Sequence, residues 1–399
     1  MIRRDLYLKK LEMYAGRDIV KIIIGARRTG KTTLIRQFID ELKGEGVPSE
    51  NIVHINFEGL VYSYFKNEAD LRSMLIEFLR EAKSRMYFFL DDMQGVPGWA
   101  LVLSEMMNLH DCEFYVSSSN ESILYDGYQK ELSYRYVKID IYPLVFSEFL
   151  MIREDDGSSL RDLFREYIRR GGMPAVYRMD GEVCDNYLRD TYSAILLKDV
   201  VQCNKLRDVS HIEKIMEFVL THIGETFSPK SIKDYVKERG ITISVDTVYS
   251  FLDALCSSRL LYRVPRYDIK DERELETQEK YYFADIAMRN AVCGEEEIPE
   301  EAVLENILFM ELLSRNFNRI NVGKLGTGSV DFIAFKGDDR TYLESCVTVE
   351  GKENVKKEFS TLSKIRDNYF KMVLSMDDET IVNKGGIINY PLLKFLTEG

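Results

Sequence analysis

Eight residues near the amino end have the types and spacing that bind phosphate. Gly25-Ala26-Arg27-Arg28-Thr29-Gly30-Lys31-Thr32 matches the pattern G-x-x-x-x-G-K-[ST]. The glycines of such a loop let backbone N–H groups approach a phosphate, and the start of the following helix attracts anions. Lys31 would reach the β- and γ-phosphates of a nucleotide, and Thr32 would hold Mg²⁺. The sequence therefore predicts a nucleotide-binding loop that ends at Thr32 and Thr33.

The segments on either side of this loop have the character that the motif requires. An apolar strand is predicted over Ile19–Ile24, directly before the first glycine. After Lys31, apolar side chains recur at helical spacing from Leu34 to Leu42. A strand, a loop and a helix in this order are the setting of a phosphate-binding loop, which disfavours the alternative of a chance glycine-rich turn.

A pair of acids follows a later apolar strand. The run Tyr87-Phe88-Phe89-Leu90-Asp91-Asp92 has the pattern of the second motif that phosphoryl transfer needs beside the phosphate loop. Asp91 is predicted to bind Mg²⁺ directly or through water, and Asp92 to orient the attacking water. Nucleotide hydrolases usually carry the longer glutamate there, so slow hydrolysis or a nucleotide switch is an open interpretation. The alternative is two acids that merely end a strand.

Other polar residues at strand ends are candidates for contact with the nucleotide. Asn120 ends the run Ser117-Ser118-Ser119-Asn120 and is a candidate γ-phosphate sensor, with an ordinary polar turn as the alternative. Arg135 precedes the next strand and is a candidate arginine finger, including toward a neighbouring subunit, with a surface arginine as the alternative. Within the loop, either Arg27 or Arg28 could stabilise the triphosphate charge. The catalytic candidates are Lys31, Asp92, Asn120 and Arg135.

The first 150 residues alternate strand-like and helix-like segments. This alternation predicts an α/β fold with a mainly parallel sheet and helices on both faces. Ligands of such sheets bind at the carboxyl ends of the strands, where the phosphate loop would lie. The predicted strands are Ile19–Ile24, Ile52–Phe57, Met86–Leu90, Glu113–Ser117 and Tyr136–Ile141.

Composition limits the remaining possibilities. The 399 residues are 45% hydrophobic and carry a net charge of −12. From this length and charge we expect two or three domains and no general affinity for nucleic acid or anionic membranes. The six cysteines include no C-x-x-C pair and the four histidines are dispersed, which argues against a disulfide framework or a zinc site. His54 is interpreted as a core residue. Without an apolar leader or a run of eighteen apolar residues, a cytoplasmic protein is expected.

Beyond residue 150 the character of the chain changes. Residues 1–150 would form the P-loop domain. Residues 151–208 have a helical pattern, which a turn at Gly171-Gly172-Met173-Pro174 interrupts, and we expect this region to be a lid or connector. In residues 209–293 the pattern predicts three helices followed by a β-hairpin, with Ser228 and Ser244 as helix caps. This order of elements favours a winged helix. After an acidic run, residues 294–399 predict a small α/β domain.

With these segments in order, the chain resembles the AAA-type ATPases of bacteria and archaea that carry a C-terminal domain of unknown function. The resemblance implies ATP with Mg²⁺ as the ligand, and a restriction-endonuclease-like fold after a winged helix. Two positions depart from the family pattern: Asp92 stands where glutamate is usual, and Ser117-Ser118 where threonine-glycine is usual. The segments that carry the resemblance are Gly25–Thr32, Leu90–Gln94 with Gly98-Trp99, Ser117–Asn120, Pro143–Leu150, Gly171–Pro174, Tyr281–Asp285 and Val330–Phe332.

A nuclease of that fold needs carboxylates that hold Mg²⁺ and a lysine that positions water. The candidate carboxylates are Glu305, Asp331 and Glu344. The lysine is expected two residues after the last acid, but that position is Cys346. We therefore expect an inactive domain that serves in binding or assembly, unless another lysine, such as Lys352, takes its place.

The predicted winged helix is a second route to nucleic acid. Its third helix, within residues 244–257, carries Asp246 and Asp253 and no lysine or arginine, whereas base and phosphate contacts favour basic and amide side chains. The hairpin offers arginines that could touch a DNA backbone, and a domain for protein contact is the alternative. These arginines are Arg259, Arg263 and Arg266.

The leading hypothesis is an intracellular Mg²⁺-dependent ATPase or nucleotide switch. Its nucleotide state would change how the N-terminal domain contacts the winged-helix and C-terminal domains. The alternatives are a DNA-associated adaptor or a metal-dependent nuclease that the NTPase domain regulates. The sequence leaves open the DNA or protein partner and the oligomeric state, and the choice of ATP over GTP comes from the resemblance alone.

Overall fold

The computed structural model describes most of the chain, and the described residues form two compact units. An N-terminal unit combines Met1–Ile141 with two short later segments, Ala194–Lys205 and Ser257–Arg259. A C-terminal unit contains the rest of the chain, so the backbone passes between the units several times. The described residues are 2–58, 67–124, 128–132, 135–153, 157–204, 206, 209–294, 298–317, 319–379, 381–382 and 385–398.

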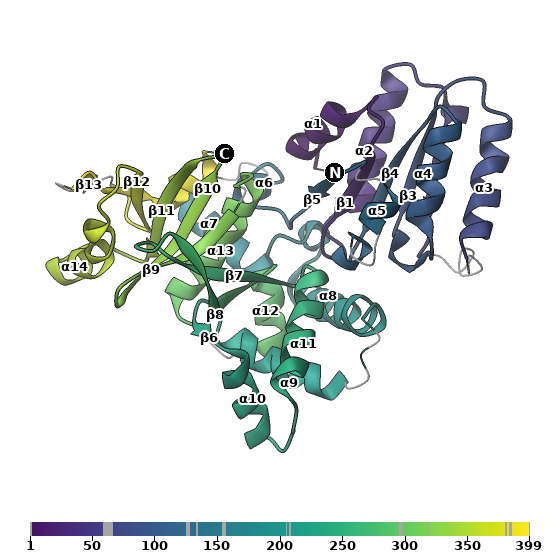
Figure 1. Ribbon diagram of the computed structural model, residues 1–399. Helices are drawn as coiled ribbons and strands as arrows, with labels where there is room; N and C mark the ends of the chain where they lie inside the picture. The colour runs from purple at the N-terminus through teal and green to yellow at the C-terminus, as the bar shows by residue number, and fades with distance from the viewer. Residues whose placement is uncertain are drawn as a thin grey trace. The chain divides into compact units, whose positions relative to one another are not determined.

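Five parallel strands form the sheet of the N-terminal unit (Figure 1). Their order across the sheet is β2-β3-β4-β1-β5. Each strand predicted from the sequence is present, with ends that differ by one residue at most, so the predicted parallel α/β sheet is confirmed. The strands are β1 (Val20–Ile24), β2 (Ile52–Asn56), β3 (Met86–Asp91), β4 (Cys112–Ser118) and β5 (Tyr136–Asp140).

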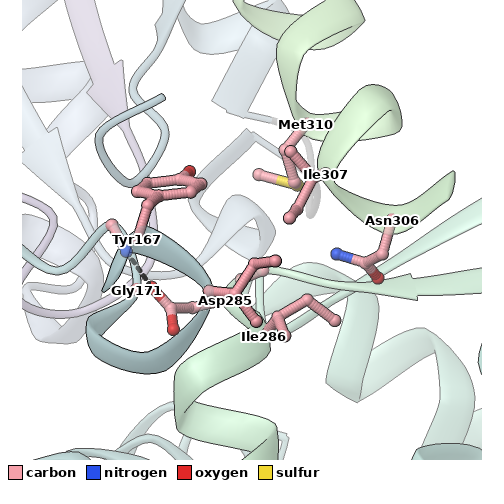
Figure 2. Close-up of a pocket in the computed structure, with 10 residues that line it drawn as sticks. Tyr167, Gly171, Asp285, Ile286, Asn306, Ile307 and Met310 are labelled. Atoms are coloured by element: carbon pink, nitrogen blue, oxygen red, sulfur yellow. Dashed lines mark hydrogen bonds between the residues drawn. The ribbon is translucent and has the colours of Figure 1, made fainter. Parts of the chain in front are cut away.

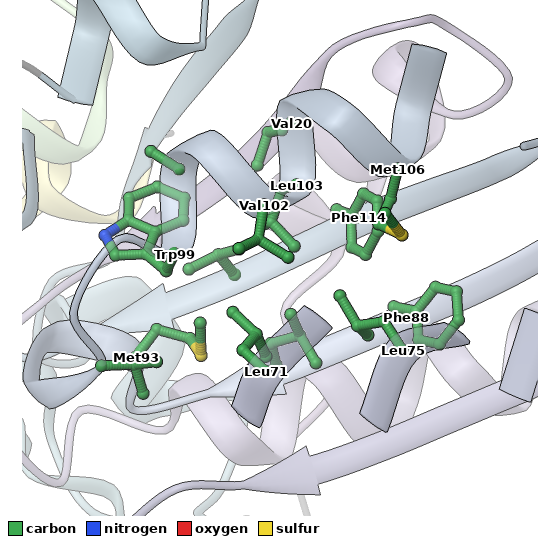
Figure 3. Close-up of a cluster of buried hydrophobic side chains, with 14 of the residues drawn as sticks. Val20, Leu71, Leu75, Phe88, Met93, Trp99, Val102, Leu103, Met106 and Phe114 are labelled. Carbon is green, nitrogen blue, oxygen red and sulfur yellow. The ribbon is translucent and has the colours of Figure 1, made fainter. Parts of the chain in front are cut away.

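Helices cover both faces of this sheet and bury an apolar layer on each. On one face, Leu71, Trp99 and Phe114 of β4 belong to one buried apolar cluster, as Figure 3 shows. On the other face, Leu11 and Phe38 pack against the opposite side of the same strands. Because helices cover the central strands on both faces, the sequences of these strands are continuous apolar runs. The helices are α1 (Asp5–Tyr14), α2 (Lys31–Gly44), α3 (Glu68–Arg80), α4 (Trp99–Leu109) and α5 (Tyr128–Glu131), with short 3-10 turns at Ser49–Asn51, Met93–Gly95 and Glu121–Leu124.

The C-terminal unit contains a mixed sheet whose order is β13-β14-β12-β11-β10-β9-β7-β8-β6. The β7–β8 hairpin is antiparallel, and β7 also pairs in parallel with β9. The hairpin of residues 209–293 and the strands of residues 294–399 therefore belong to one sheet. The strands are β6 (Thr226–Phe227), β7 (Leu261–Asp268), β8 (Arg273–Phe283), β9 (Arg319–Leu325), β10 (Gly328–Lys336), β11 (Asp339–Cys346), β12 (Phe370–Ser375), β13 (Ile381–Val382) and β14 (Ile388–Pro391).

Three helices precede the hairpin, as the sequence predicts, and the two predicted caps are present. Ser228 Oγ accepts the N–H of Ser231 at 3.2 Å, and Ser244 Oγ accepts the N–H of Thr247 at 3.0 Å. The winged-helix and restriction-endonuclease-like assignments stay predictions, as does the division into four domains. The helices outside the N-terminal sheet are α6 (Phe146–Leu150), α7 (Leu160–Arg170), α8 (Gly181–Ala194), α9 (Val209–Thr221), α10 (Pro229–Glu238), α11 (Val245–Ser257), α12 (Ile286–Cys293), α13 (Glu300–Ser314), α14 (Lys352–Ser360) and α15 (Leu392–Thr397), with 3-10 turns at Pro174–Arg178 and Leu362–Lys364 and the π-helix η6 (Ile195–Gln202).

Two motifs that are distant in the sequence meet inside the C-terminal unit (Figure 2). Asp285 caps α12 by accepting the N–H of Met288 at 2.9 Å, and it also accepts the N–H of Gly172 at 2.5 Å. Gly171 has a φ of +79°, and a Cβ there would lie 2.2 Å from Asp285 Oδ1, so this turn requires glycine for two reasons. Tyr167 lines the small cavity beside Asp285. The hydrogen bond between Gly172 and Asp285 therefore gives the Gly171–Pro174 and Tyr281–Asp285 motifs a structural role.

Within the described part of the chain, no helix combines the length and the apolar character needed to cross a bilayer. The six cysteines are free thiols, and two of them, Cys184 and Cys346, are buried.

Gly171→Ala should destabilise the protein by about 2–4 kcal/mol, because its φ of +79° and ψ of −171° are essentially restricted to glycine and an added Cβ would clash with the buried Asp285 carboxylate. Gly181 is a matched control: its φ is +50°, but nothing lies within 4 Å of an added Cβ. Gly181→Ala should therefore cost only about 1–2 kcal/mol of backbone strain. Urea unfolding followed by circular dichroism measures both variants, and equal losses would contradict a role for the Asp285 contact.

Candidate functional site

The phosphate loop joins the carboxyl end of β1 to the start of α2. A Cβ on Gly25 would lie 2.3 Å from the Ile141 carbonyl oxygen, so only glycine fits beside the end of β5. Gly30 has a φ of +99° and directly precedes α2 as its N-cap. The Thr29 hydroxyl donates to the Ala26 carbonyl at 2.8 Å and closes the loop. Gly25 is therefore required by the close approach of Ile141 and Gly30 by its positive φ, while the wrapping of a phosphate by the loop stays a prediction.

Lys31 folds back over this loop and is only 6% exposed. Its Nζ donates to the carbonyl oxygens of Gly25 at 3.0 Å and Ala26 at 3.1 Å. Burial lowers the pKa of Lys31, while the charges of Asp92 and Asp91 act in the opposite direction. Phosphate oxygens are stronger partners for an ammonium group than carbonyls are, so Lys31 is placed to exchange these carbonyls for a phosphate.

Two other loop-border residues were predicted to touch the nucleotide. Arg28 is exposed and has a φ of +68°. Thr33 is half-buried in the first turn of α2. Contact of either residue with a nucleotide stays a prediction.

Asp91 and Thr32 come together at the end of β3, as expected for a magnesium pair. Thr32 Oγ1 donates to Asp91 Oδ2 at 2.5 Å, and the Ser117 hydroxyl donates to Asp91 Oδ1. Burial would raise the pKa of Asp91, but the nearby His54 ring and hydrogen bonds from Ser117 and Thr32 outweigh it and hold the pKa below its usual value. A hydroxyl beside an ionised carboxylate fits Mg²⁺, which takes oxygen ligands. His54, interpreted from the sequence as a core residue, thus lies at the edge of this site, with Nε2 3.9 Å from Asp91 Oδ2.

Asp92 follows Asp91 in a left-handed conformation, with a φ of +58°. Its N–H donates to Ser117 Oγ at 3.1 Å, and Gln94 Nε2 lies 3.5 Å from its carboxylate. Burial raises the pKa of Asp92, with the charge of Lys31 acting against the rise. A carboxylate whose pKa is raised is a better proton acceptor than an ordinary aspartate.

The predicted sensor Asn120 is fully buried and hydrogen-bonded to protein groups. Its Nδ2 donates to the main-chain oxygen of Asp199 at 2.6 Å, and its Oδ1 accepts the N–H of Ser122 at 2.8 Å. The neighbouring Ser119 hydroxyl donates to Asp199 Oδ1 at 2.6 Å and accepts from Gln94 Nε2 at 3.1 Å. The end of β4 is therefore tied to Asp199, and contact of Asn120 with a phosphate stays a prediction.

Sequence reasoning missed Asp199, whose carboxylate binds the loop residue Arg27. Arg27 Nε and Nη2 each donate to an Asp199 oxygen at 2.9 Å, a bidentate pair, and Nη1 donates to Glu58 Oε1 at 2.5 Å. Burial alone would lower the pKa of Arg27, but the hydrogen bond and charge of Asp199 raise it. The available signal was an acid within the apolar run 195–201, because aspartate is almost never buried without a partner.

Arg135 lies at the opposite edge of the sheet from the phosphate loop. It precedes Tyr136, which pairs with Val20 at the start of β1, whereas the loop follows the end of β1. Its guanidinium donates to Asp18 Oδ2 at 2.8 Å and to Asn108 Oδ1 at 2.9 Å. Arg135 therefore does not line the loop of its own chain, and a role toward a neighbouring subunit stays a prediction.

The carboxylates predicted as nuclease candidates gather in the C-terminal unit. Lys280 Nζ lies 2.5 Å from Glu305 Oε1 and 3.6 Å from Asp331 Oδ1. Glu344 Oε2 accepts the N–H of Asp331 at 3.2 Å. Burial, followed by the charge of Asp331, raises the pKa of Glu305 to about 7 and that of Glu344 well above its usual value. We call these four side chains the Lys280 cluster.

The cation of this cluster is not one that the sequence suggested. Cys346 is a buried thiol, and Lys352 is exposed at the start of α14. Lys280 comes from β8 instead, so the cluster contains an ammonium group although the expected position is a cysteine. Among the described residues, no three or more His, Cys, Asp or Glu side chains are arranged to hold a metal ion.

The arginines predicted to contact DNA have protein partners. Arg263 Nη2 donates to Asp253 Oδ1 at 2.7 Å, and Arg259 Nη2 donates to Asp140 Oδ1 at 2.8 Å. Arg266 Nε donates to the Thr277 carbonyl at 3.2 Å. Contact of this hairpin with DNA stays a prediction.

Residues 17–150 match the sequence family described as an AAA domain, and residues 161–298 match a domain of unknown function (DUF8612). An uncharacterized protein of Haemophilus influenzae is 32% identical over 377 residues, which cover 94% of this chain and 93% of the other. An uncharacterized protein of Methanocaldococcus jannaschii is 23% identical over 397 residues, 95% of this chain and 86% of the other. In solved structures, a Walker-type ATPase of Pyrococcus abyssi is similar at 14% identity with a TM-score of 0.49, over 73% of this chain and 96% of its own. The Orc1 protein of Aeropyrum pernix, solved in complex with DNA, is similar at 12% identity with a TM-score of 0.37. This match covers 74% of this chain and 93% of the Orc1 chain.

The Lys280 cluster predicts a stability that falls as pH rises. A carboxyl with a raised pKa binds its proton more tightly in the folded chain, so the free energy of unfolding decreases as pH rises above 4.5, the usual pKa of glutamate. Glu344→Gln should stabilise the protein by about 1–3 kcal/mol at pH 8 and change little at pH 4.5. Urea unfolding at the two pH values measures this, with Glu350→Gln at an exposed site as the control. A gain that is the same at both pH values would contradict the buried-charge explanation.

Proposed function

Since this chain belongs to a family of proteins that join an AAA domain to a domain of unknown function, we propose that it binds ATP and Mg²⁺ at the phosphate loop. Hydrolysis of ATP, slow or coupled to a switch, is the reaction we assign to it. The observation that carries the proposal is the meeting of Lys31, Thr32 and Asp91, which come from two separate motifs. The choice of adenine follows the family resemblance.

Each residue of the loop would contribute a distinct interaction to phosphate binding. The backbone N–H groups of the loop and the start of α2 would bind the phosphate oxygens, and the Lys31 ammonium would neutralise their charge. Thr32 and Asp91 would hold Mg²⁺, which supplies further charge neutralisation to the phosphoryl group. The hydroxyl of Ser117 would orient the Asp91 carboxylate, and the nearby His54 ring would help to keep its pKa low.

Asp92 would orient the attacking water and take up its proton. Its raised pKa and its place beside Lys31 support this role. Its side chain is one methylene shorter than the usual glutamate, which is the reason to expect slow turnover. Asn120 is the better candidate for contact with the nucleotide, because it lies at the same edge of the sheet as the phosphate loop. Arg135 lies at the opposite edge.

The rest of the chain would respond to the nucleotide. We assign residues 1–150 to nucleotide binding, 151–208 to a connector, 209–293 to a winged helix and 294–399 to a domain for binding or assembly. A metal-dependent nuclease stays the alternative, because Lys280 supplies an ammonium group among the carboxylates. A DNA or protein partner and a cytoplasmic location belong to the same proposal, and the free cysteines fit a reducing compartment.

Lys31→Met should weaken the binding of Mg·ATP by about 100-fold, because it removes a charge-assisted contact to the phosphates while keeping the side chain's length. Titration calorimetry measures the dissociation constants of the wild type and the variant. Lys43→Met, at an exposed site near the end of the same helix, is the matched control and should bind like the wild type. Equal affinity of Lys31→Met and the wild type would contradict the proposed site.

Asp92→Asn should lower the rate constant of ATP hydrolysis by about 100-fold without weakening the binding of Mg·ATP, because the carboxylate acts on water rather than on the metal. Single-turnover release of phosphate measures the rate even when it is slow. Asp40→Asn on the exposed face of α2 is the control. A variant that hydrolyses ATP at the wild-type rate would remove Asp92 from the mechanism.

A further inference from the structure

A short segment from the middle of the chain belongs to the N-terminal unit. The residues Ala194–Lys205 are part of it, although the chain before and after them belongs to the C-terminal unit. Ile195–Gln202 forms the π-helix η6, which continues directly from α8. π-helical turns are rare and occur frequently at functional sites. We call Ile195–Gln202 the latch segment.

Asp199 is the residue through which the latch segment holds the nucleotide site. It is 1% exposed, and its carboxylate accepts hydrogen bonds from Nε and Nη2 of Arg27 and from the Ser119 hydroxyl. Its main-chain oxygen receives the side-chain amide of Asn120. One residue therefore binds the phosphate loop and the end of β4 at the same time. Lys198 adds a contact at 2.8 Å to Glu58, the second carboxylate on Arg27.

The charges around this contact conflict with a bound triphosphate. Asp91, Asp92 and Asp199 all act on the charge of Lys31. A triphosphate in the loop adds several negative charges at short range, where like charges repel strongly once water is excluded. Arg27 keeps its charge under all ordinary conditions, so its guanidinium can neutralise either Asp199 or the phosphates, but not both fully.

Resting on the proposed nucleotide site, we propose that Asp199 is a positioning residue that competes with the polyphosphate of the nucleotide for Arg27. Binding of Mg·ATP draws Arg27 toward the phosphates and weakens the hold on Asp199. The latch segment then loosens, and the change passes along the chain into the C-terminal unit, to which the backbone connects on both sides. A ligand shifts an equilibrium only through such a difference in contacts.

Neutralising this carboxylate tests the competition in the full-length chain. Asp199→Asn keeps the side chain's shape and an oxygen for the Ser119 hydroxyl but removes the charge. We expect it to bind Mg·ATP about 10-fold more tightly than the wild type, measured by titration calorimetry. Asp190→Asn, at an exposed position of α8, is the control and should bind like the wild type. A purely structural ion pair predicts equal or weaker binding, and that result would overturn the proposal.

The competition also predicts that the gain requires Arg27. In an Arg27→Gln background, Asp199→Asn should produce no further increase in affinity, because the contested guanidinium is gone. A gain of the same size in both backgrounds would show that Asp199 acts through general charge repulsion and would overturn the latch.

Hydrogen exchange of the wild-type chain gives a readout that does not depend on any variant folding. The amides of residues 195–202 should exchange several-fold faster with a non-hydrolysable Mg·ATP analogue than without it. Unchanged or slower exchange at saturating analogue would overturn the latch while leaving the nucleotide site in place. If the wild type binds no nucleotide in calorimetry, the proposed function fails and the latch with it.

Discussion

The carboxyl edge of the N-terminal sheet holds more carboxylates than cations, and this imbalance determines how the site is built. Asp91, Asp92 and Asp199 lie there with Lys31 and Arg27. Each carboxylate is stabilised in a different way: hydroxyl donors keep one ionised, burial raises the pKa of the second, and a bidentate arginine neutralises the third. A nucleotide that enters such a site must bring its own cation, which is the physical reason for assigning Mg²⁺ to it.

Buried charges elsewhere in the chain show what a balanced arrangement looks like. At the opposite edge of the same sheet, Lys21 Nζ lies 2.9 Å from Glu113 Oε2, and Arg85 and the Tyr115 hydroxyl also donate to that carboxylate. Nothing is left for a ligand to neutralise, so we regard this cluster as structural. The Lys280 cluster is the reverse case, because one ammonium faces several carboxylates and the excess is relieved by raised pKa values.

The parts of the fold that the sequence predicts are those set by local patterns. The phosphate loop and the five parallel strands follow from glycine spacing and from apolar runs, and the structure places them within one residue of the expected bounds. Asp199 is 172 positions from Arg27 and Lys280 is 25 positions from Glu305, so no local pattern connects either pair. The pairing of β7 with β9, which makes one sheet of two predicted domains, is likewise a tertiary contact.

The two segments that return to the N-terminal unit carry charges with different consequences. Arg259, in the short segment Ser257–Arg259, has a φ of +59° and binds Asp140 at 2.8 Å and Glu121 at 2.9 Å. These partners lie outside the phosphate loop, so a nucleotide does not compete for them. Asp199 shares its partner with the loop. Because a ligand acts only on contacts that differ between bound and free states, the nucleotide proposed for the loop would weaken the Asp199 contact and leave the Arg259 contact in place.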